Sequence, residues 1–340
     1  MITLLFALAG CGYSTASTSA DPALTTVKVG IMPIPDCATI PLAEARGYFK
    51  AEGLKVERVD VQGGGTALPM LENRSIQFSI MNYPAMVLYE AHKPNQVKIA
   101  ADAYQAAPNT FKLMVPKDSP IRSVTDLRGK RVGVATLKSI STLTTEAALK
   151  VAGLTARDVA FAETPLPAMI VALENGHLGA AWMTEPFITA YQSQHGGRAL
   201  YDVMQGQTED LPIAGWATST AYARSNPAQV AAFQRAVMRA QLDVARDEQL
   251  VRSILPTYTK IDGRTAGVIT LGVFPTDLHP NRIQKITDLM QEYGYINSSI
   301  DVRRFLLPPP ALTHTPAPPP PIPPSSPSLS PASTDSEQTS

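Results

Sequence analysis

Apolar residues along this chain alternate between the two-residue period of a strand and the longer period of a helix. Residues 27–32 form an apolar run of the strand type, and residues 40–52 place Leu42, Ala45 and Phe49 at helical spacing. Because strands and helices follow one another in turn, the pattern predicts parallel sheets with right-handed crossovers. In the first part of the chain it further predicts strands at 55–61, 78–81, 97–104 and 111–115 and helices at 66–73 and 84–92.

A second unit of the same kind begins near Lys117. Its pattern predicts strands at 131–135, 160–164, 179–182 and 199–203 and helices at 141–153, 167–175 and 186–195. The chain then returns through an apolar stretch at 213–220 to helical segments at 227–247, 248–255, 264–273 and 281–293. We interpret this order as one α/β unit inserted within another, so the expected fold class is α/β.

The N-terminal residues predict targeting rather than fold. Leu8-Ala9-Gly10-Cys11 is a run of small residues that ends in cysteine after an apolar stretch, as in a lipoprotein signal. We therefore expect a signal peptide at 1–10, a lipid on Cys11, a tether at 11–26, and a location on the outer face of the cytoplasmic membrane. Met1-Ile2-Thr3 lacks the usual basic residue, so either the true start lies upstream or the assigned start is wrong. The alternative is a cytosolic protein in which both cysteines are ordinary thiols.

Composition narrows the range of partners. The formal net charge is zero and the basic residues form no cluster, which makes nucleic acid an unexpected partner. No apolar run approaches the roughly 20 residues that span a bilayer. The five histidines are scattered without metal-ligand spacing, so we expect neither a metal nor a cofactor. Residues 306–340 are rich in proline and predict a disordered tail.

Five short stretches together resemble one known family. The chain is similar to the solute-binding proteins of ABC importers that serve nitrate, aliphatic sulfonates, taurine and the pyrimidine precursor of thiamine. Each stretch is weak alone, but all five occur in the family's order across about residues 27–305. They are IPLAEARGYFKAEGLKV (40–56), GGGT (63–66), NYP (82–84), VTDLRGKRV (124–132) and WMTEPF (182–187).

The resemblance implies a type II periplasmic binding protein fold, in which two lobes, each a mainly parallel sheet with flanking helices, close on a ligand. It places the first lobe at 27–113 plus 214–305 and the second at 114–213, with two hinge crossings near 113–116 and 210–215. The implied function is delivery of a small polar organic solute, namely a sulfonate, a taurine-like zwitterion or an aminopyrimidine. The implied partners are that solute and the permease subunits of an ABC importer, and we expect a monomer.

Two loops of the pattern lead from a strand into a helix start that is rich in glycine or hydroxyl residues. Backbone N–H groups at such a start receive anions or carbonyl oxygens. The alternative for both loops is simple helix capping. The candidate ligand-binding residues here are Gly64, Gly65 and Thr66 in the first loop and Lys138, Ser139, Ser141 and Thr142 in the second.

Other candidate residues follow neighbouring strands. Asp36 and Cys37 follow the first strand, where an acid suits a ligand amine or aminopyrimidine and repels a dianion. Cys37 is more typical of a small buried residue. Asn82 and Tyr83 end the third strand, and Tyr83 either faces the ligand or packs under its own helix. Glu185 either accepts a hydrogen bond from the ligand or caps the next helix.

Trp216 lies near the return crossing, where an aromatic ring either covers the ligand or packs in the core.

Two functions other than solute binding remain open at this point. One is an enzyme that resembles the pyrimidine-precursor synthases of the same fold, although the chain shows no Ser–His or Cys–His signature. The other is a ligand-sensing or cell-wall interaction domain that uses the proline-rich tail.

Overall fold

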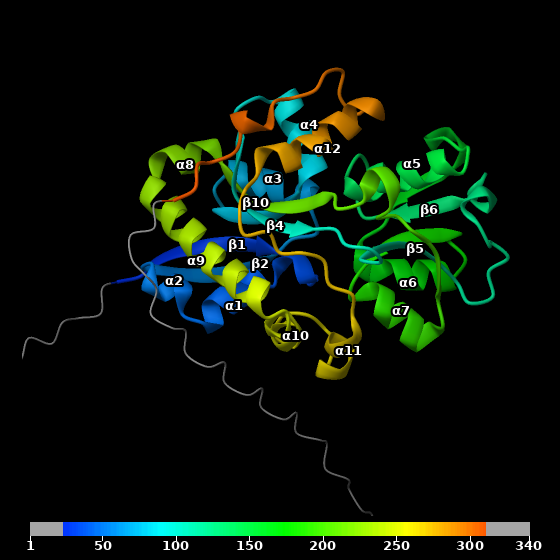
Figure 1. The fold of residues 1–340 in the computed structure, drawn as a ribbon, viewed down its shortest axis with the longest axis horizontal. Helices are drawn as coiled ribbons and strands as arrows, with labels where there is room; N and C mark the ends of the chain where they lie inside the picture. Colours follow the sequence, from blue (N-terminus) through cyan, green and yellow to red (C-terminus); the bar gives the residue numbers. More distant parts are fainter. Residues whose placement is uncertain (1–22, 311–340) are drawn as a thin grey trace, which may run out of the picture.

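The computed structural model describes residues 23–310, which form two lobes built on two five-stranded sheets (Figure 1). The predicted signal segment, Cys11, the tether up to residue 22 and the tail beyond residue 310 lie outside the described residues. The first sheet has the order β2-β1-β3-β10-β4. Its strands are β1 (Thr25–Ile31), β2 (Leu54–Asp60), β3 (Phe78–Asn82), β4 (Val97–Gln105) and β10 (Pro212–Ser219).

The second sheet repeats the topology of the first, in the order β7-β6-β8-β5-β9. Both sheets are mixed rather than fully parallel, because β10 and β5 run antiparallel to both of their neighbours. Each of these two strands is the one by which the chain enters a lobe from the other. The strands are β5 (Phe111–Val115), β6 (Arg131–Val134), β7 (Ala160–Glu163), β8 (Ala180–Thr184) and β9 (Arg198–Asp202).

The crossings between the lobes lie close to the positions expected from the sequence. All of β5 belongs to the second sheet, so the first crossing is residues 106–110 and precedes the expected 113–116. The second crossing, residues 203–211, connects β9 to β10. The backbone N–H of Asn109 donates to Oδ2 of Asp202 at 2.7 Å, which joins the first crossing to the end of β9.

Helices cover both faces of each sheet, as the alternating pattern predicts (Figure 1). The second lobe holds α5 (Ile140–Val151), α6 (Leu166–Glu174) and α7 (Phe187–His195). The first lobe holds α1 (Thr39–Ala45), α2 (Tyr48–Ala51), α3 (Gly64–Glu72), α4 (Tyr83–His92), α8 (Thr220–Ser225), α9 (Pro227–Arg246), α10 (Gln249–Ile254), α11 (Gly263–Val268) and α12 (Pro280–Glu292).

Two predicted helices differ from the observed ones. The helix expected at 40–52 is divided into α1 and α2, because Gly47 adopts a left-handed conformation with φ of 69°. The helix expected at 264–273 ends with α11 at Val268. Beyond it the chain runs back to the first sheet, where Val273 forms a β-bridge with Gln105. Backbone pairing with that sheet replaces the last turns of the predicted helix.

The core of the first lobe is aromatic. The rings of Phe78 on β3 and Phe233 on α9 stack with centroids 3.8 Å apart and an interplanar angle of 3°. Trp216 on β10 meets Phe233 edge-on at 6.2 Å, and all three side chains are fully buried. The sheet and α9 therefore pack through large rings, which supply much of the apolar area removed from water.

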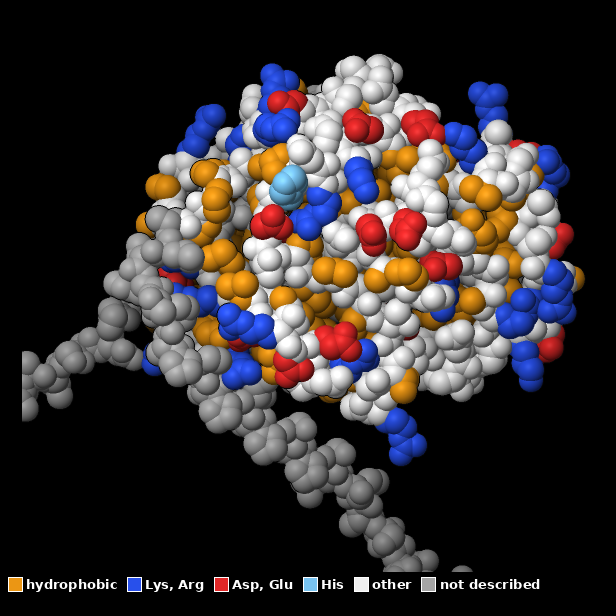
Figure 2. Space-filling view, in the orientation of Figure 1, with side chains coloured by type: hydrophobic (Ala, Val, Ile, Leu, Met, Phe, Trp, Pro, Cys, Tyr) orange, Lys and Arg blue, Asp and Glu red, His pale blue; other side chains and the backbone are white. Residues whose placement is uncertain are grey.

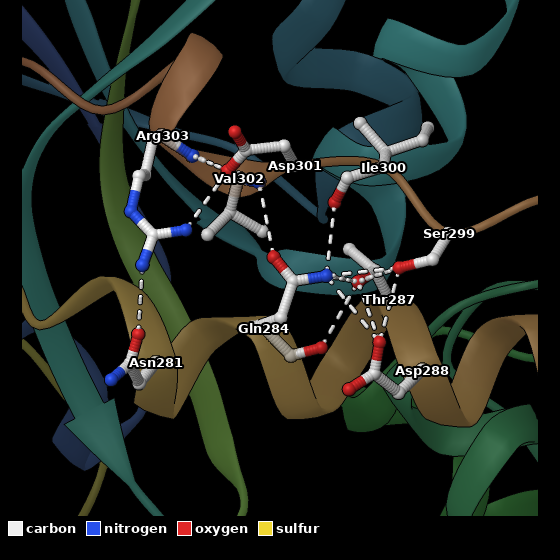
Figure 3. Close-up of polar contacts among 9 residues, drawn as sticks. All are labelled: Asn281, Gln284, Thr287, Asp288, Ser299, Ile300, Asp301, Val302 and Arg303. Carbon is white, nitrogen blue, oxygen red and sulfur yellow. Dashed lines mark hydrogen bonds and ion pairs between the residues drawn. The ribbon is translucent and has the colours of Figure 1, made fainter.

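The C-terminal segment is fixed to α12 and to the edge of the first sheet. The side-chain amide of Gln284 on α12 donates to the carbonyl oxygen of Ile300 at 3.1 Å (Figure 3). The N–H of Leu307 donates to the carbonyl oxygen of Ile99 on β4 at 2.9 Å. Residues 306–308, which the sequence assigns to the tail, therefore continue the folded lobe along β4, because the unpaired edge of β4 accepts them.

Charges of both signs are interspersed on the face of the molecule shown in Figure 2, with no broad field of one sign. Among the described residues, no helix is both long and apolar enough to cross a membrane.

Candidate functional site

A cavity lies between the two lobes, where loops from both sheets meet. It has walls from each lobe, and the loops touch across it, since a Cβ built on Gly63 would lie 3.9 Å from the Thr136 methyl group. The first lobe lines it with Met32, Ile34, Asp36, Gln62, Gly63, Ile80, Met81, Asn82, Ile213 and Ala214. The second lobe lines it with Phe111, Ala135, Thr136, Ser139, Ile140, Leu166, Trp182 and Thr184.

The position of the cavity follows from the sheet order. In each sheet the order of the parallel strands reverses beside the first of them, β1 or β6: the next strand in the chain pairs with one edge of it and the following strand with the other. Ligands of open α/β sheets bind at the carboxyl ends of strands at such a reversal. The loop that carries Asp36 follows β1, and the loop that carries Ser139 occupies the equivalent position after β6. The two equivalent loops face one another across the cavity, so both lobes contribute to one site.

Asp36 is the most unusual residue of the cavity. Its side chain is 2% exposed, and its Oδ1 atom has no hydrogen-bond partner. Burial raises the pKa of this carboxyl to about 7, although its own backbone N–H partly offsets the shift. A buried acceptor without a donor destabilises the folded protein, which is why such groups concentrate at functional sites.

Three titratable side chains surround Asp36. Cys37 is adjacent in the chain, while Tyr104 comes from β4 and Tyr258 from the segment after α10. The Tyr258 hydroxyl donates to the carbonyl oxygen of Ile34 at 2.9 Å, and the Tyr104 hydroxyl accepts from a backbone N–H. Burial raises the pKa of all three groups well above their ordinary values, so they remain uncharged at neutral pH.

Two aromatic side chains of the second lobe form one wall of the cavity. The rings of Phe111 on β5 and Trp182 on β8 stack with centroids 5.1 Å apart at 25°. The Trp182 indole N–H donates to the hydroxyl of Thr144 at 3.0 Å, which fixes the ring and satisfies its only polar atom. This wall is therefore rigid and apolar, and it suits a flat ligand.

The loop before α5 caps its own helix. The Ser139 hydroxyl donates to the carbonyl oxygen of Thr136 at 2.7 Å and lies 2.9 Å from the Ser141 hydroxyl. The Thr142 hydroxyl accepts from the backbone N–H of Ser139 at 2.9 Å. Ser139 lines the cavity, whereas Ser141 and Thr142 are buried behind it. Lys138 is exposed and does not line the cavity.

The glycine-rich loop before α3 contributes less than the sequence suggests. Gly63 lines the cavity, but Gly64 packs against α4, since a Cβ on it would lie 2.9 Å from that of Ala85. Gly65 and Thr66 are exposed, and the Thr66 hydroxyl donates to the carbonyl oxygen of Gly63 at 3.0 Å, within its own loop. A glycine is therefore required at Gly64 by packing rather than by close approach to a ligand.

Of the remaining candidates, Asn82 lines the cavity, whereas Tyr83, Trp216, Cys37 and Glu185 do not. Asn82 also caps α4 by accepting from Ala85 at 3.0 Å. Tyr83 and Trp216 are fully buried in the core of the first lobe, where the Tyr83 hydroxyl donates to Asp102 at 2.8 Å. Cys37 is fully buried beneath the cavity and does not line it.

Glu185 caps α7 instead of facing the cavity. Its carboxylate accepts from the backbone N–H of Thr189 at 3.1 Å and from the Thr189 hydroxyl at 2.9 Å. It also accepts from the backbone N–H of Thr270 at 3.2 Å, on the segment after α11. Because Thr270 belongs to the first lobe and Glu185 to the second, this contact also ties the two lobes together.

Sequence analysis missed the aromatic wall. Phe111 and Trp182 stand in apolar strand runs, so nothing in their spacing distinguishes them from core residues. A signal did exist for Trp182, because it lies on β8, which pairs with β6 at the reversal point of the second sheet, whereas Phe111 begins β5, which pairs with β8. Using it requires the strand order, which the sequence pattern does not provide.

A second hollow in the described part of the chain lies on one lobe. It is lined by residues of the first lobe such as Glu90, Asn95 and Arg304 and includes none of the loop residues described above. The Glu90 carboxylate there accepts from the backbone N–H groups of Asn95 and Val97, so it is satisfied by its own loop. Within residues 23–310, no group of His, Cys, Asp and Glu side chains is arranged to hold a metal ion.

Two lobes of this topology around a cavity define the type II periplasmic binding protein fold. The sequence profile described as NMT1/THI5 like matches residues 34–249, and the chain belongs to this family. A relative by sequence is the riboflavin-binding protein RibY of Chloroflexus aurantiacus, 27% identical over 235 residues. That match covers 66% of this chain, and it spans only 64% of the length of RibY.

Solved structures share the fold at low sequence identity. The alkanesulfonate-binding protein SsuA from Xanthomonas axonopodis pv. citri, bound to MOPS, has a TM-score of 0.68 and is 18% identical, with 85% of this chain and 99% of that chain covered. The ligand-binding component of an ABC-type import system from Staphylococcus aureus, with zinc bound, has a TM-score of 0.71 at 15% identity. That alignment covers 83% of this chain and 96% of the other. At these identities the likeness concerns the fold alone.

Proposed function

We propose that this protein is a solute-binding protein that captures a small polar organic molecule outside the cytoplasm and delivers it to an ABC importer. Membership of the NMT1/THI5-like family and the fold support this function. The observation that carries it is the cavity between the lobes, because it has walls from both lobes and contains an unpartnered buried acid.

Ligand capture in such a fold is a shift between open and closed arrangements. A ligand in the cavity contacts the loop after β1 and the loop after β6 at once only when the lobes are together. Since only the closed form makes both sets of contacts, ligand binding stabilises that form. The two crossings at 106–110 and 203–211 are the segments that must bend.

Anchoring is proposed to depend on Cys11. The Leu-Ala-Gly-Cys run supplies small residues before an acceptor thiol, and a lipid on that thiol would keep the protein at the outer face of the membrane. In cells that express the full chain, Cys11→Ala should move the protein from the membrane fraction to the soluble fraction. An unprocessed wild-type chain in the cytosol would contradict this localisation.

The function itself is tested by a ligand screen on the full chain. Sulfonates, taurine, nitrate, aminopyrimidines and flavins are compared for their effect on the midpoint of thermal unfolding, because a ligand that binds only the folded state raises it. We expect one class to raise the midpoint in proportion to its concentration, with no chemical conversion of the ligand. Turnover of the bound compound would instead support the enzyme alternative.

A further inference from the structure

We infer that the cavity takes a flat nitrogen heterocycle with at least one N–H donor, which Asp36 receives, and that it rejects free sulfonate and nitrate anions. This inference rests on the proposed function, because it names the solute class of the same cavity.

The first line of evidence is the state of Asp36. Asp36 lines the cavity, its side chain is 2% exposed, and its Oδ1 has no hydrogen-bond partner in the described chain. Neither nearby hydroxyl supplies that donor: the Tyr258 hydroxyl donates to the carbonyl oxygen of Ile34, and the Tyr104 hydroxyl makes no hydrogen bond to Oδ1. A ligand N–H placed in the cavity completes this acceptor, whereas an anion brings a second negative charge to it.

The second line of evidence is the lack of positive charge. The residues that line the cavity in the described chain include no Lys or Arg, and the candidate cation Lys138 is exposed outside it. The hydroxyls of Ser139 and Ser141 are engaged with each other and with Thr136. A sulfonate or nitrate in this cavity would therefore lose its hydration without a cation to replace it.

The third line of evidence is the shape of the cavity. The cavity is small, with a volume of about 60 Å³. On one side stand the stacked rings of Phe111 and Trp182, and the opposite lobe contributes aliphatic side chains such as Met32 and Ile80. A planar ring buries both of its faces against such walls while its edge reaches a polar group. These features together favour a flat heterocycle over a branched or tetrahedral anion.

Asp36 also predicts how affinity depends on pH. The titratable groups that face it are Cys37, Tyr104 and Tyr258, and all three keep their protons at neutral pH because burial raises their pKa values. The pKa of Asp36 itself is about 7 before a ligand binds. The carboxylate accepts a hydrogen bond more strongly than the neutral acid, so affinity for an N–H donor should rise from about pH 6 to about pH 8.

The experiment is calorimetric titration of the full chain with cytosine and riboflavin as heterocycles and with ethanesulfonate, taurine and nitrate as anionic or zwitterionic probes. We expect at least one heterocycle to bind and the other three probes not to. Asp36→Asn should weaken heterocycle binding by about ten-fold or more and should remove the rise with pH. The matched control is Asp118→Asn, the same change at an exposed acid of the second lobe, which should leave affinity unchanged.

The outcomes separate the inference from the function on which it rests. Binding of ethanesulfonate, taurine or nitrate with heterocycles excluded would overturn the inference and leave a solute-binding protein. Heterocycle binding that is unaffected by Asp36→Asn would overturn the role of Asp36. Failure of every probe, together with failure of the wider thermal screen, would count against the proposed function itself.

Discussion

At the scale of single residues, the buried carboxyl of Asp36 destabilises the folded protein at neutral pH and above. Burial raises its pKa to about 7 from an ordinary value of 3.8, so between these values the folded chain holds a proton that the unfolded chain has lost. The stability contributed by that proton is full below about pH 4 and is lost as the pH rises to about 7. A residue retained at such a cost is typical of a binding site rather than of a core.

Asp36→Asn should therefore stabilise the ligand-free protein at about pH 8. A difference of about three pKa units corresponds to at most about 4 kcal/mol, and the gain should vanish at about pH 3, where the wild-type acid is mostly protonated in both states. Urea unfolding at the two pH values measures this, with Asp118→Asn as the control. Equal stability of variant and wild type at both pH values would mean that the carboxyl is not desolvated.

Sequence reasoning located the polar part of the site better than its apolar part. Asp36 was a candidate because it follows the first predicted strand, where an acid suits a ligand amine, and it lines the cavity of the structure. Tyr83 and Trp216 lie in the core of the first lobe, and position near a strand end does not reveal on which face of the sheet a side chain lies. Glu185 and Ser139 carry the helix-capping role that was the alternative for each, whereas the Ser141 hydroxyl donates to the carbonyl oxygen of Thr136.

At the scale of single elements, the junction of α3 and α4 depends on one missing Cβ. Gly64→Ala places a methyl group 2.9 Å from that of Ala85 and 3.3 Å from the end of Met81, so α3 must shift. We expect a loss of about 1–3 kcal/mol in the free energy of unfolding. Gly65→Ala is the matched control, because a Cβ there meets open space, and it should be neutral or slightly stabilising.

Denaturant unfolding of the two alanine variants provides the comparison. A similar loss of stability in both would show that helix start geometry, not contact with α4, explains the glycines. The sequence alone suggested a ligand role for this loop, and only the three-dimensional position of Ala85 on α4 gives Gly64 its packing role.

Element boundaries followed from local sequence wherever the local signal was strong. Gly47 divided one predicted helix, and pairing of Val273 with Gln105 shortened another. The first of these was visible in the sequence as a glycine within a helical run. The second was not, because a β-bridge to a residue far earlier in the chain leaves no local pattern.

At the scale of the whole molecule, contacts between the lobes influence the balance of open and closed forms. Lys150 on α5 of the second lobe pairs with Glu292 on α12 of the first at 2.5 Å and lies over the ring of Tyr293 at 5.4 Å. Lys150→Ala removes both contacts, so it should weaken ligand affinity by no more than a few-fold, with the effect decreasing as salt is added.

The chain supplies a close control for this variant. Lys93 pairs with Glu72 and lies over the ring of Tyr89, with side chains 60% and 39% exposed against 59% and 39% for the pair of Lys150. Both members of this control pair belong to the first lobe. Calorimetry should therefore show weaker ligand binding for Lys150→Ala and unchanged ligand binding for Lys93→Ala. Equal effects would mean that the contact of Lys150 has no part in closure.

The most direct test of the account is small-angle X-ray scattering of the protein with and without a saturating ligand. The heterocycle that gives the largest thermal shift is the ligand to use, and Asp36→Asn at the same concentration provides the comparison. The account predicts a smaller radius of gyration when the wild-type protein is saturated, because the two lobes close over the cavity. An unchanged scattering profile for a protein that calorimetry shows to be saturated would contradict it.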